Sequence, residues 1–481
     1  MLENKNAPFL VIEKILYEQV SGGKFVFKKG ESYDFMDSVT AGNIIFHPCE
    51  GEELEKNVVI LPEKPIDYES IDKLLETIRN FIHKWLDIPE DFEQFAVWYV
   101  LLTWFYDLMF NICYLSAHGD TGTGKSRFLD TIGPLCYRPI RGSGSVSVAG
   151  LKRIIDKWKG TLLIDEGDVK DSNEKNEFIK ILNLGTEKNK PIFNCNKKDP
   201  QKLEFFLPYC PKLITRRRQF EDSALEARCI TNVMEQTSRK DIKRNLTSVF
   251  FSEQETIRNK LLKFRLDYYD KINPETSKPI DFELEPRIEQ TAMVFYPLFT
   301  HIPGAADKFK KFIIAYGQKV IDERAESFDG NIINALIDLV IDGEMEISSS
   351  DIENRLVRDY GFRDYKPANI GRRLSTLGLK PIPKKVNGKT KKVVPIEDPK
   401  FIGIAKRYCS DLTKVEMVSK VTQVTPNSEI PDNTGKKNIQ IMKNHICRNY
   451  RNHRNLKIGF IEGCMSPTNS QKINLKVMNY Q

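Results

Sequence analysis

The sequence contains no closely spaced cysteine pair of the C-x-x-C type, although it has nine cysteines in 481 residues. Scattered cysteines favour a reduced compartment such as the cytoplasm, and they argue against a protein built on a disulfide framework. The first residues, MLENKNAPF, lack a basic stretch followed by an apolar run, so we expect no secretion signal. No repeat with a solenoid period is evident. The length and composition predict a soluble cytoplasmic protein of about two to four domains.

An uninterrupted apolar run that could span a membrane is also lacking. The stretch AVWYVLLTWFYDLMFNICYLSA, residues 96–117, comes close, but Asp107 and Asn111 interrupt it. A charged residue in the middle of a bilayer costs about 2.5–3.5 kcal/mol even on insertion scales. We therefore predict a buried helix to about Phe110 and a core strand over 112–117, and we expect no membrane partner.

A strong excess of one charge is absent, because the formal net charge is only +7. The basic residues gather instead in KPANIGRRLSTLGLKPIPKKVNGKTKK, residues 366–392, which contains no acidic residue. A helix with Ile370, Leu374 and Leu377 toward a core, followed by a hairpin turn at Asn387-Gly388, indicates a winged helix. Its charges would contact DNA phosphates, with a protein-binding winged helix as the alternative. The predicted DNA contacts here are Arg372, Arg373, Lys384, Lys385, Lys389, Lys391 and Lys392.

What the sequence does contain is a phosphate-binding loop, in the stretch LSAHGDTGTGKSRF. It matches G-x-x-x-x-G-K-S, with an apolar strand before it and a helix after it. The backbone N–H groups of such a loop converge on phosphate oxygens at the start of the helix. We predict that Lys125 reaches the β- and γ-phosphates of ATP and that Ser126 ligates Mg²⁺. The predicted ATP-binding residues are Gly119, Asp120, Thr121, Gly122, Thr123, Gly124, Lys125 and Ser126.

A buried strand that ends in two carboxylates follows forty residues after Lys125, in GTLLIDEGD. We predict that Asp165 holds Mg²⁺ through water and that Glu166 orients and deprotonates the attacking water. The adjacent glutamate favours an ATP hydrolase over a protein that uses nucleotide only as a binding switch.

The segment CPKLITRRRQFEDSALEARCI predicts a further strand and, after it, a catalytic arginine. Thr215 would emerge at the end of the strand beside Glu166 and position the lytic water. Arg228 precedes the next apolar run, where it suits a finger that reaches the γ-phosphate of a neighbouring subunit. The arginines at 216–218 are competitors for that role, and we favour Arg228.

Apolar strands alternate with amphipathic helices over 111–232, which predicts an α/β fold with a parallel sheet. The flanking segments differ in pattern, because short β-like runs precede the sheet and helical periodicity follows it. We divide the chain into a small β-rich extension (1–62), a nucleotide-binding core (63–240), a helical lid (241–325), a winged helix (326–400), and a linker with a basic tail (401–481).

The order of these motifs resembles that of the AAA+ ATPases. Within that group, SVSVAGLKRIIDKWKGTLLIDE and ALEARCI resemble segments of the MCM helicases, and the likeness is greatest to the MCM-like replicative helicases of mobile genetic elements. The resemblance covers roughly 65–400. It implies a AAA+ P-loop sheet with a helical lid, ATP and Mg²⁺ as cofactors, a hexameric ring, and DNA helicase activity in replication.

The resemblance also implies roles for two further sets of residues. A lid arginine of the family senses the γ-phosphate, and Arg287 in ELEPRIEQTAMVFYPLF matches it. In related rings a β-hairpin between the acidic strand and the next core strand projects into the pore and grips DNA. Here KNKPIFNCNKKDPQKLEFF has two strand-like runs around a polar turn, and the lysines that would contact single-stranded DNA are Lys197, Lys198 and Lys202.

Two alternative functions remain open from the sequence. The chain could be a superfamily-three helicase of viral or plasmid type, which shares the ring and the pore hairpin. It could also be a AAA+ initiator or regulator that uses ATP to assemble on DNA without unwinding it. Unwinding of a forked duplex distinguishes a motor from such a switch.

Overall fold

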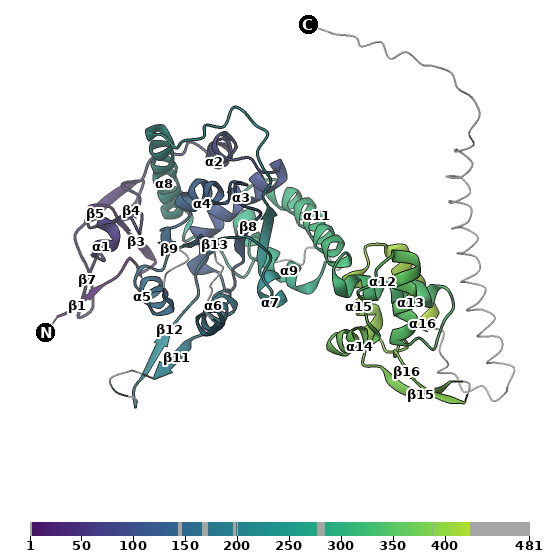
Figure 1. The fold of residues 1–481 in the computed structure, drawn as a ribbon. Coiled ribbons are helices and arrows are strands. Elements are labelled where there is room, and N and C mark those ends of the chain that lie inside the picture. Colours follow the sequence, from purple (N-terminus) through teal and green to yellow (C-terminus); the bar gives the residue numbers. More distant parts are fainter. Residues whose placement is uncertain are drawn as a thin grey trace, which may run out of the picture. The chain divides into compact units, whose positions relative to one another are not determined.

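The computed structural model describes residues 2–142, 147–165, 172–195, 199, 201–276, 284–386 and 388–423. The chain forms two compact units, Met1–Ala315 and Tyr316–Gln481. Figure 1 shows the ribbon of both units. The predicted divisions at 62/63 and 240/241 both fall inside the first unit.

A five-stranded parallel sheet forms the centre of unit 1, in the order β14-β8-β13-β10-β9. Its strands are short apolar runs that are mostly buried, as expected for a parallel sheet covered on both faces. This mixed α/β architecture is compatible with a P-loop NTPase fold. The bounds are β8 (Tyr114–His118), β9 (Ile140–Gly142), β10 (Leu162–Ile164), β13 (Lys212–Arg216) and β14 (Cys229–Val233).

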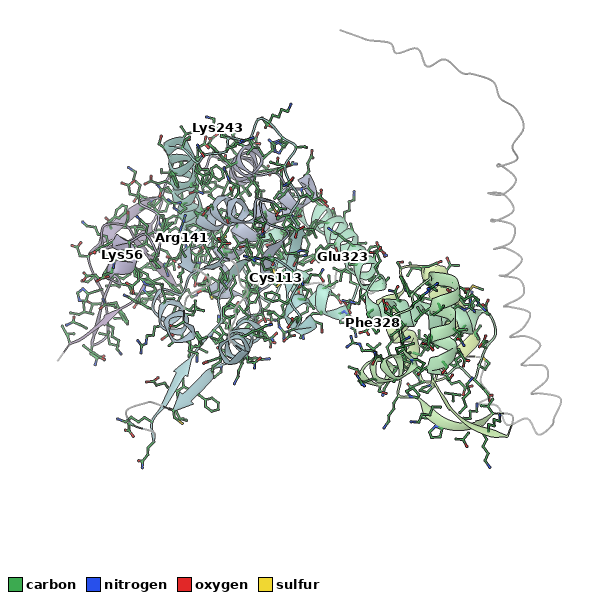
Figure 2. All side chains as sticks on the ribbon, viewed as in Figure 1. Lys56, Cys113, Arg141, Lys243, Glu323 and Phe328 are labelled. Atoms are coloured by element: carbon green, nitrogen blue, oxygen red, sulfur yellow. The ribbon has the colours of Figure 1, made fainter. Side chains whose placement is uncertain are left out.

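The helices of unit 1 pack around this sheet (Figure 1). Tyr99 of α3 donates its hydroxyl proton to the Lys212 carbonyl, 2.8 Å away, which ties α3 to β13. Figure 2 shows Cys113, one of the buried thiols, among the packed side chains of the interior. The bounds are α2 (Ile71–Trp85), α3 (Glu90–Thr103), α4 (Lys125–Ile132), α5 (Val148–Trp158), α6 (Ser172–Leu184), α7 (Ser223–Glu226) and α8 (Ser248–Tyr268).

The membrane-like stretch is a buried helix followed by a core strand, as predicted, but the helix is shorter than expected. It ends at Thr103, and a 3-10 turn (Tyr106–Leu108) precedes β8. The turn brings the Asp107 carboxylate to the guanidinium of Arg265, at 2.8 and 3.0 Å, and to the Tyr269 hydroxyl at 2.7 Å. Within the described residues, no helix is both long and apolar enough to cross a membrane.

The N-terminal residues form two small sheets, of which the four-stranded sheet β2-β3-β4-β5 attaches to the core through the buried carboxylate of Glu18. Glu18 is 2% exposed and accepts hydrogen bonds from Tyr137 (2.9 Å), Arg138 (3.0 Å) and Arg265 (2.6 Å). Because Glu18 lies on β3, this hydrogen-bond network links the four-stranded sheet to α8 and to the core. The strands are β1 (Glu3–Asn6), β2 (Phe9–Ile12), β3 (Ile15–Val20), β4 (Lys24–Lys29), β5 (Ser32–Met36), β6 (Val39–Ala41) and β7 (Ile44–His47), with the short helix α1 (Glu52–Glu55) after them.

Aromatic side chains fasten the helices after α8 to α3. Phe95 stacks on Phe312 at a centroid distance of 4.9 Å, and Phe295 lies 4.9 Å from Phe309. Because these rings are buried, the helical segment and the sheet share one core. The helices are α9 (Pro286–Met293), α10 (Tyr296–Phe299) and α11 (Ala305–Ala325), of which α11 continues into unit 2.

A two-stranded antiparallel hairpin projects from unit 1 (Figure 1). Its strands are β11 (Ile192–Cys195) and β12 (Leu203–Phe206). The two strand-like runs predicted between the acidic strand and the next core strand are thus confirmed as paired strands. Lys197 and Lys198 lie outside the described residues.

The part of unit 2 that the structure describes, to residue 423, is a helical module with a basic hairpin. Helix α14 (Pro367–Thr376) turns Ile370 and Leu374 into the core, as predicted, and the hairpin pairs β15 (Ile382–Val386) with β16 (Lys389–Val393). Gly388 in the turn has φ +78°, a left-handed conformation that glycine adopts without strain. The other helices are α12 (Phe328–Ile341), α13 (Ser349–Tyr360), α15 (Lys400–Tyr408) and α16 (Leu412–Gln423).

Candidate functional site

The predicted phosphate loop lies between the end of β8 and the start of α4, and its glycines are required by the backbone. Gly122 and Gly124 have φ values of +83° and +93°, in the region that side chains disfavour. At Gly119, a Cβ atom would lie 2.6 Å from the Met234 carbonyl oxygen. The loop therefore keeps its shape only with glycine at these three positions.

The ammonium group of Lys125 bends back over the loop. Its Nζ donates to the carbonyl oxygens of Gly119 (2.8 Å) and Asp120 (2.6 Å). The Thr123 hydroxyl donates to the same Asp120 carbonyl at 2.8 Å. A positive charge is thus held beside the backbone N–H groups that begin α4, which is the arrangement that receives a phosphate.

Three predicted side chains meet at the carboxyl edge of the sheet. The Asp165 carboxylate accepts a hydrogen bond from the Thr215 hydroxyl at 2.7 Å, and the Ser126 hydroxyl lies 3.3 Å from its other oxygen. They meet because β13 lies between β8 and β10, so Thr215 emerges between the loop and the acidic strand. A carboxylate and a hydroxyl are the hard oxygen ligands that suit Mg²⁺. The fourth predicted residue of this edge, Glu166, lies outside the described residues.

Asp130 is a further carboxyl near this cluster that none of the sequence motifs identifies. Burial raises the pKa of Asp130, and the negative charge of Asp165 adds to the effect. Arg141 forms an ion pair with it at 3.5 Å. The sequence could have revealed Asp130 through its spacing, because it follows Ser126 by four residues and so lies on the same face of the helix.

Arg228 and the phosphate loop lie at opposite ends of the parallel strands: Arg228 at the amino ends, and the loop at the carboxyl ends. It precedes β14, and its carbonyl accepts from the backbone N–H of Tyr114, the first residue of β8. The loop begins only after the five residues of β8, which span about 16 Å at roughly 3.3 Å per residue. The Arg228 guanidinium also contacts residues of its own edge, donating to the Ala224 carbonyl (2.7 Å) and the Thr186 hydroxyl (3.3 Å). It therefore does not reach the loop of its own chain.

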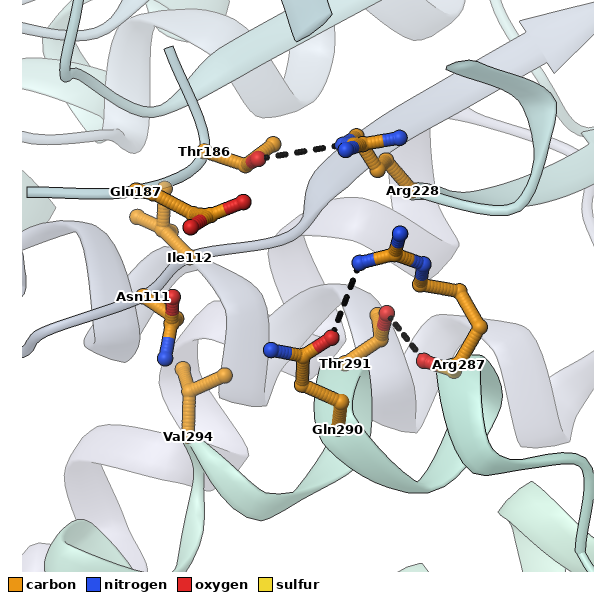
Figure 3. A pocket seen from close by; sticks show the side chains of 9 residues that line it. All are labelled: Asn111, Ile112, Thr186, Glu187, Arg228, Arg287, Gln290, Thr291 and Val294. Carbon is orange, nitrogen blue, oxygen red and sulfur yellow. Dashed lines mark hydrogen bonds between the residues drawn. The ribbon is translucent and has the colours of Figure 1, made fainter. Parts of the chain in front are cut away.

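Arg287 lies beside Arg228 rather than beside the phosphate loop. Both arginines line one pocket together with the carboxylate of Glu187, and Figure 3 shows these side chains. Arg287 donates to the Gln290 side-chain oxygen at 2.9 Å. Burial, and then the positive charge of Arg287, lower the pKa of Arg228. Two converging guanidinium groups form a candidate site for an anion.

Among the competing arginines, Arg216 is held inside the protein. Its side chain is 1% exposed, forms an ion pair with Glu226 and stacks over the Phe220 ring at 4.0 Å. Its Nε also donates to the Ser116 hydroxyl at 3.1 Å. This guanidinium serves packing between strands and is not presented to another molecule.

No family model matches the chain, and no curated protein matches it. Among the solved structures that resemble it is "The A form apo structure of NrS-1 C terminal region-CTR". That structure has a TM-score of 0.37 and 12% identity, covering 77% of this chain and 94% of that chain.

A second structure of that region, residues 305–718, has a TM-score of 0.33 and 11% identity, covering 79% of this chain and 96% of that chain. "Structure of Drosophila ORC bound to DNA" has a TM-score of 0.18 and 13% identity, covering 75% of this chain and 94% of that chain. All three TM-scores are below 0.5, so the function of this chain must be inferred from its own residues.

The predicted DNA-contacting residues differ in how far their charge is already paired. Lys202 of the unit 1 hairpin has a side chain that is 78% exposed, 3.7 Å from the Asp199 carboxylate. In unit 2, Arg373 pairs with Asp329, Lys384 with Glu346 and Lys391 with Asp351, at 2.6, 3.3 and 2.6 Å. The exposed basic residues that remain of the predicted set are Arg372, Lys385, Lys389 and Lys392.

Proposed function

We propose that this chain is a AAA+ ATPase that moves single-stranded DNA as a replicative helicase, in a ring of identical subunits and, by resemblance, six of them. The observation that carries the proposal is the position of Arg228. It lies at the edge of the sheet opposite to the phosphate loop, in a chain whose sequence holds every other part of an ATP site. A second copy of the chain can supply the missing charge.

In the proposed site, the loop residues 119–126 cradle the triphosphate, and Lys125 contacts its β- and γ-phosphates. Ser126 and Asp165 would hold Mg²⁺, which neutralises the developing charge on the phosphates when bound. Thr215 orients Asp165 and the attacking water, and Glu166 accepts a proton from that water. Such placement supplies the positioning and electrostatic stabilisation on which phosphoryl transfer depends.

Arg228 of one subunit would complete the site of the next, together with Arg287 from the same pocket. The two guanidinium groups line one pocket, from which both would contact a γ-phosphate. An arginine supplied in trans contributes on the order of 10³–10⁵ in rate. Hydrolysis then depends on contact between subunits, which couples it to movement of the ring.

DNA contact is assigned to two places. The β11–β12 hairpin of unit 1, with Lys202 and with Lys197 and Lys198 from the turn that the sequence predicts, would track the strand. Unit 2 would act as a winged helix in which α14 and the basic β15–β16 hairpin contact phosphates. The support is the exposure of Lys202, Arg372 and the hairpin lysines in a chain of modest net charge.

Mixing two inactive variants tests the trans site. Lys125→Ala removes the phosphate contact and keeps Arg228, whereas Arg228→Ala keeps the loop and lacks the finger. Each variant alone should lack ATP turnover, and a mixture should recover part of it, because the first supplies its arginine to the loop of the second. Turnover by Arg228→Ala alone, or no recovery in the mixture with intact oligomers, would refute the trans site.

A forked-duplex assay then distinguishes a helicase from an initiator or regulator. With ATP, a helicase displaces one strand, and Lys125→Ala does not. ATP turnover and DNA binding without displaced strand would identify a switch that assembles on DNA.

A further inference from the structure

The β11–β12 hairpin has an apolar face that is exposed in this chain. Phe193 is paired directly with Phe205, and Cys195 with Leu203, so these four side chains lie on the same face. Phe193 is 62% exposed, Phe205 65% and Leu203 50%. Exposed apolar side chains that adjoin one another, unlike a single exposed side chain, indicate a binding surface.

Two buried residues on the other face of the hairpin attach its base to unit 1. Ile192 and Phe206 are paired with each other, at the base of the hairpin, and are 6% and 7% exposed. Their burial anchors the base against unit 1, while alternate residues turn outward. The exposed face is therefore held in a defined orientation, because Phe193 and Phe205 are each adjacent in sequence to a buried residue, Ile192 or Phe206.

The two rings form a small aromatic surface. Their centroids are 6.3 Å apart and their planes are inclined by 51°. Each strand has four residues, so the face is about 13 Å long and one ribbon wide. A stable subunit interface buries more than about 1,000 Å² in total, which a face of this size does not provide by itself. One or two nucleotide bases match its dimensions.

A cation lies beside this aromatic surface. Lys202 immediately precedes Leu203, the first residue of β12, and its side chain is 78% exposed, 3.7 Å from the Asp199 carboxylate. Single-strand binding sites combine cations that follow the phosphates with aromatic rings on which bases stack. The hairpin presents both on one short ribbon.

We propose that Phe193 and Phe205 form a stacking platform for the bases of single-stranded DNA. This inference rests on the proposed function and adds base contacts to the backbone contacts assigned to the hairpin lysines. Because every base has a π-face, such a platform holds any sequence. It would keep the strand in register with the hairpin while the lysines contact the phosphates.

The test compares two strands of about 20 nucleotides, oligo-dT and a strand of equal length made of abasic sites, on the full chain with a non-hydrolysable ATP analogue. Phe205→Ala and Phe193→Ala should each weaken dT binding about 5- to 150-fold and leave abasic binding unchanged. Phe205→Leu should not restore dT binding, because it keeps apolar area without a ring face. The matched control is Phe251→Ala, since Phe251 is 51% exposed on α8.

The outcomes separate this inference from the proposed function. Equal dT binding by wild type and Phe205→Ala refutes the platform and leaves the helicase intact if the fork is still unwound. Loss of oligomers and of DNA-independent ATP turnover in Phe205→Ala would instead make this face a subunit contact, and the inference wrong. If dT binding depends on the two phenylalanine rings but the fork is not unwound, the stacking platform is supported and the helicase proposal is rejected. A wild type that does not bind dT rejects both.

Discussion

The Thr215 hydroxyl donates a 2.7 Å hydrogen bond to the Asp165 carboxylate, and both groups lie at the edge where the phosphate loop begins. Thr215 is completely buried, so its hydroxyl has few alternative orientations. The bond fixes the direction in which Asp165 presents its second oxygen to Ser126. Thr215 is thus a positioning residue for the proposed metal ligand.

Thr215→Val removes this hydrogen bond while keeping the shape of the side chain. We expect the kcat for ATP hydrolysis to fall about 10- to 100-fold, because groups that orient a metal ligand contribute on that scale. Steady-state turnover over a range of Mg²⁺ concentrations measures the effect, and the Mg²⁺ requirement should rise. Thr215→Ser retains the hydroxyl and should stay close to wild type. Full activity of the valine variant would show that Asp165 needs no such support.

Arg228→Ala should abolish turnover and spare nucleotide binding. Its guanidinium lies at the far edge of the sheet from its own loop, so only the rate depends on it, by about 10³–10⁵. Turnover and the Kd of a fluorescent ATP analogue are measured together. Arg218→Ala is the matched control, because Arg218 is an exposed arginine of the competing group. A large loss in the control with an active Arg228→Ala would move the finger to 218.

Arg287→Ala should also lower ATP turnover. The double variant, Arg228→Ala with Arg287→Ala, should lower turnover by less than the product of the two single effects. The two side chains share one pocket, so their contributions to one phosphate are coupled. A double-mutant cycle on kcat/KM measures the coupling. Independent effects would place the two arginines at different sites.

Glu18→Gln should destabilise unit 1 strongly. The Glu18 carboxylate is buried between Arg138 and Arg265, and breaking such a pair leaves uncompensated charge that costs about 3–5 kcal/mol. Urea unfolding measures the change in the free energy of unfolding. Glu3→Gln is the control, since its 3.2 Å pair with Lys5 is exposed and should contribute less than about 1 kcal/mol. Equal effects would show that the buried network contributes no net stability.

Acid should loosen the N-terminal sheet from α8 through Asp267. Burial alone would raise the pKa of Asp267, but hydrogen bonds from Lys28 and Tyr33 and the charge of Lys263 lower it overall. A depressed carboxyl pKa adds stability that is present above the unfolded value, near about pH 4, and is lost as the pH falls further. Unfolding followed from about pH 7 to about pH 3 should show a weaker pH dependence in Asp267→Asn. An unchanged slope would exclude Asp267 as the titrating group.

Some elements were predictable because the signal is local. The glycine-rich loop, the acidic strand and the strand that contains Thr215 each follow from a few adjacent residues. The end of the membrane-like helix at Thr103 was not predicted, and the turn after it places Asp107 against Arg265, which lies 158 positions later in the chain. The aromatic pair on the hairpin had a signal in the alternation of PIFNC and LEFF, but only the lysines of the turn suggested a function for the hairpin.

The sequence by itself determined the motifs from which a nucleotide site is proposed, since backbone conformation and strand ends are set by near neighbours along the chain. Only the tertiary structure decided which parts face one another. The order of strands places Thr215 between the loop and the acidic strand, and the position of helix α9 puts Arg287 beside Arg228, away from the phosphate loop. Strand neighbours are chosen by packing between residues far apart in the chain, and no local pattern encodes that choice.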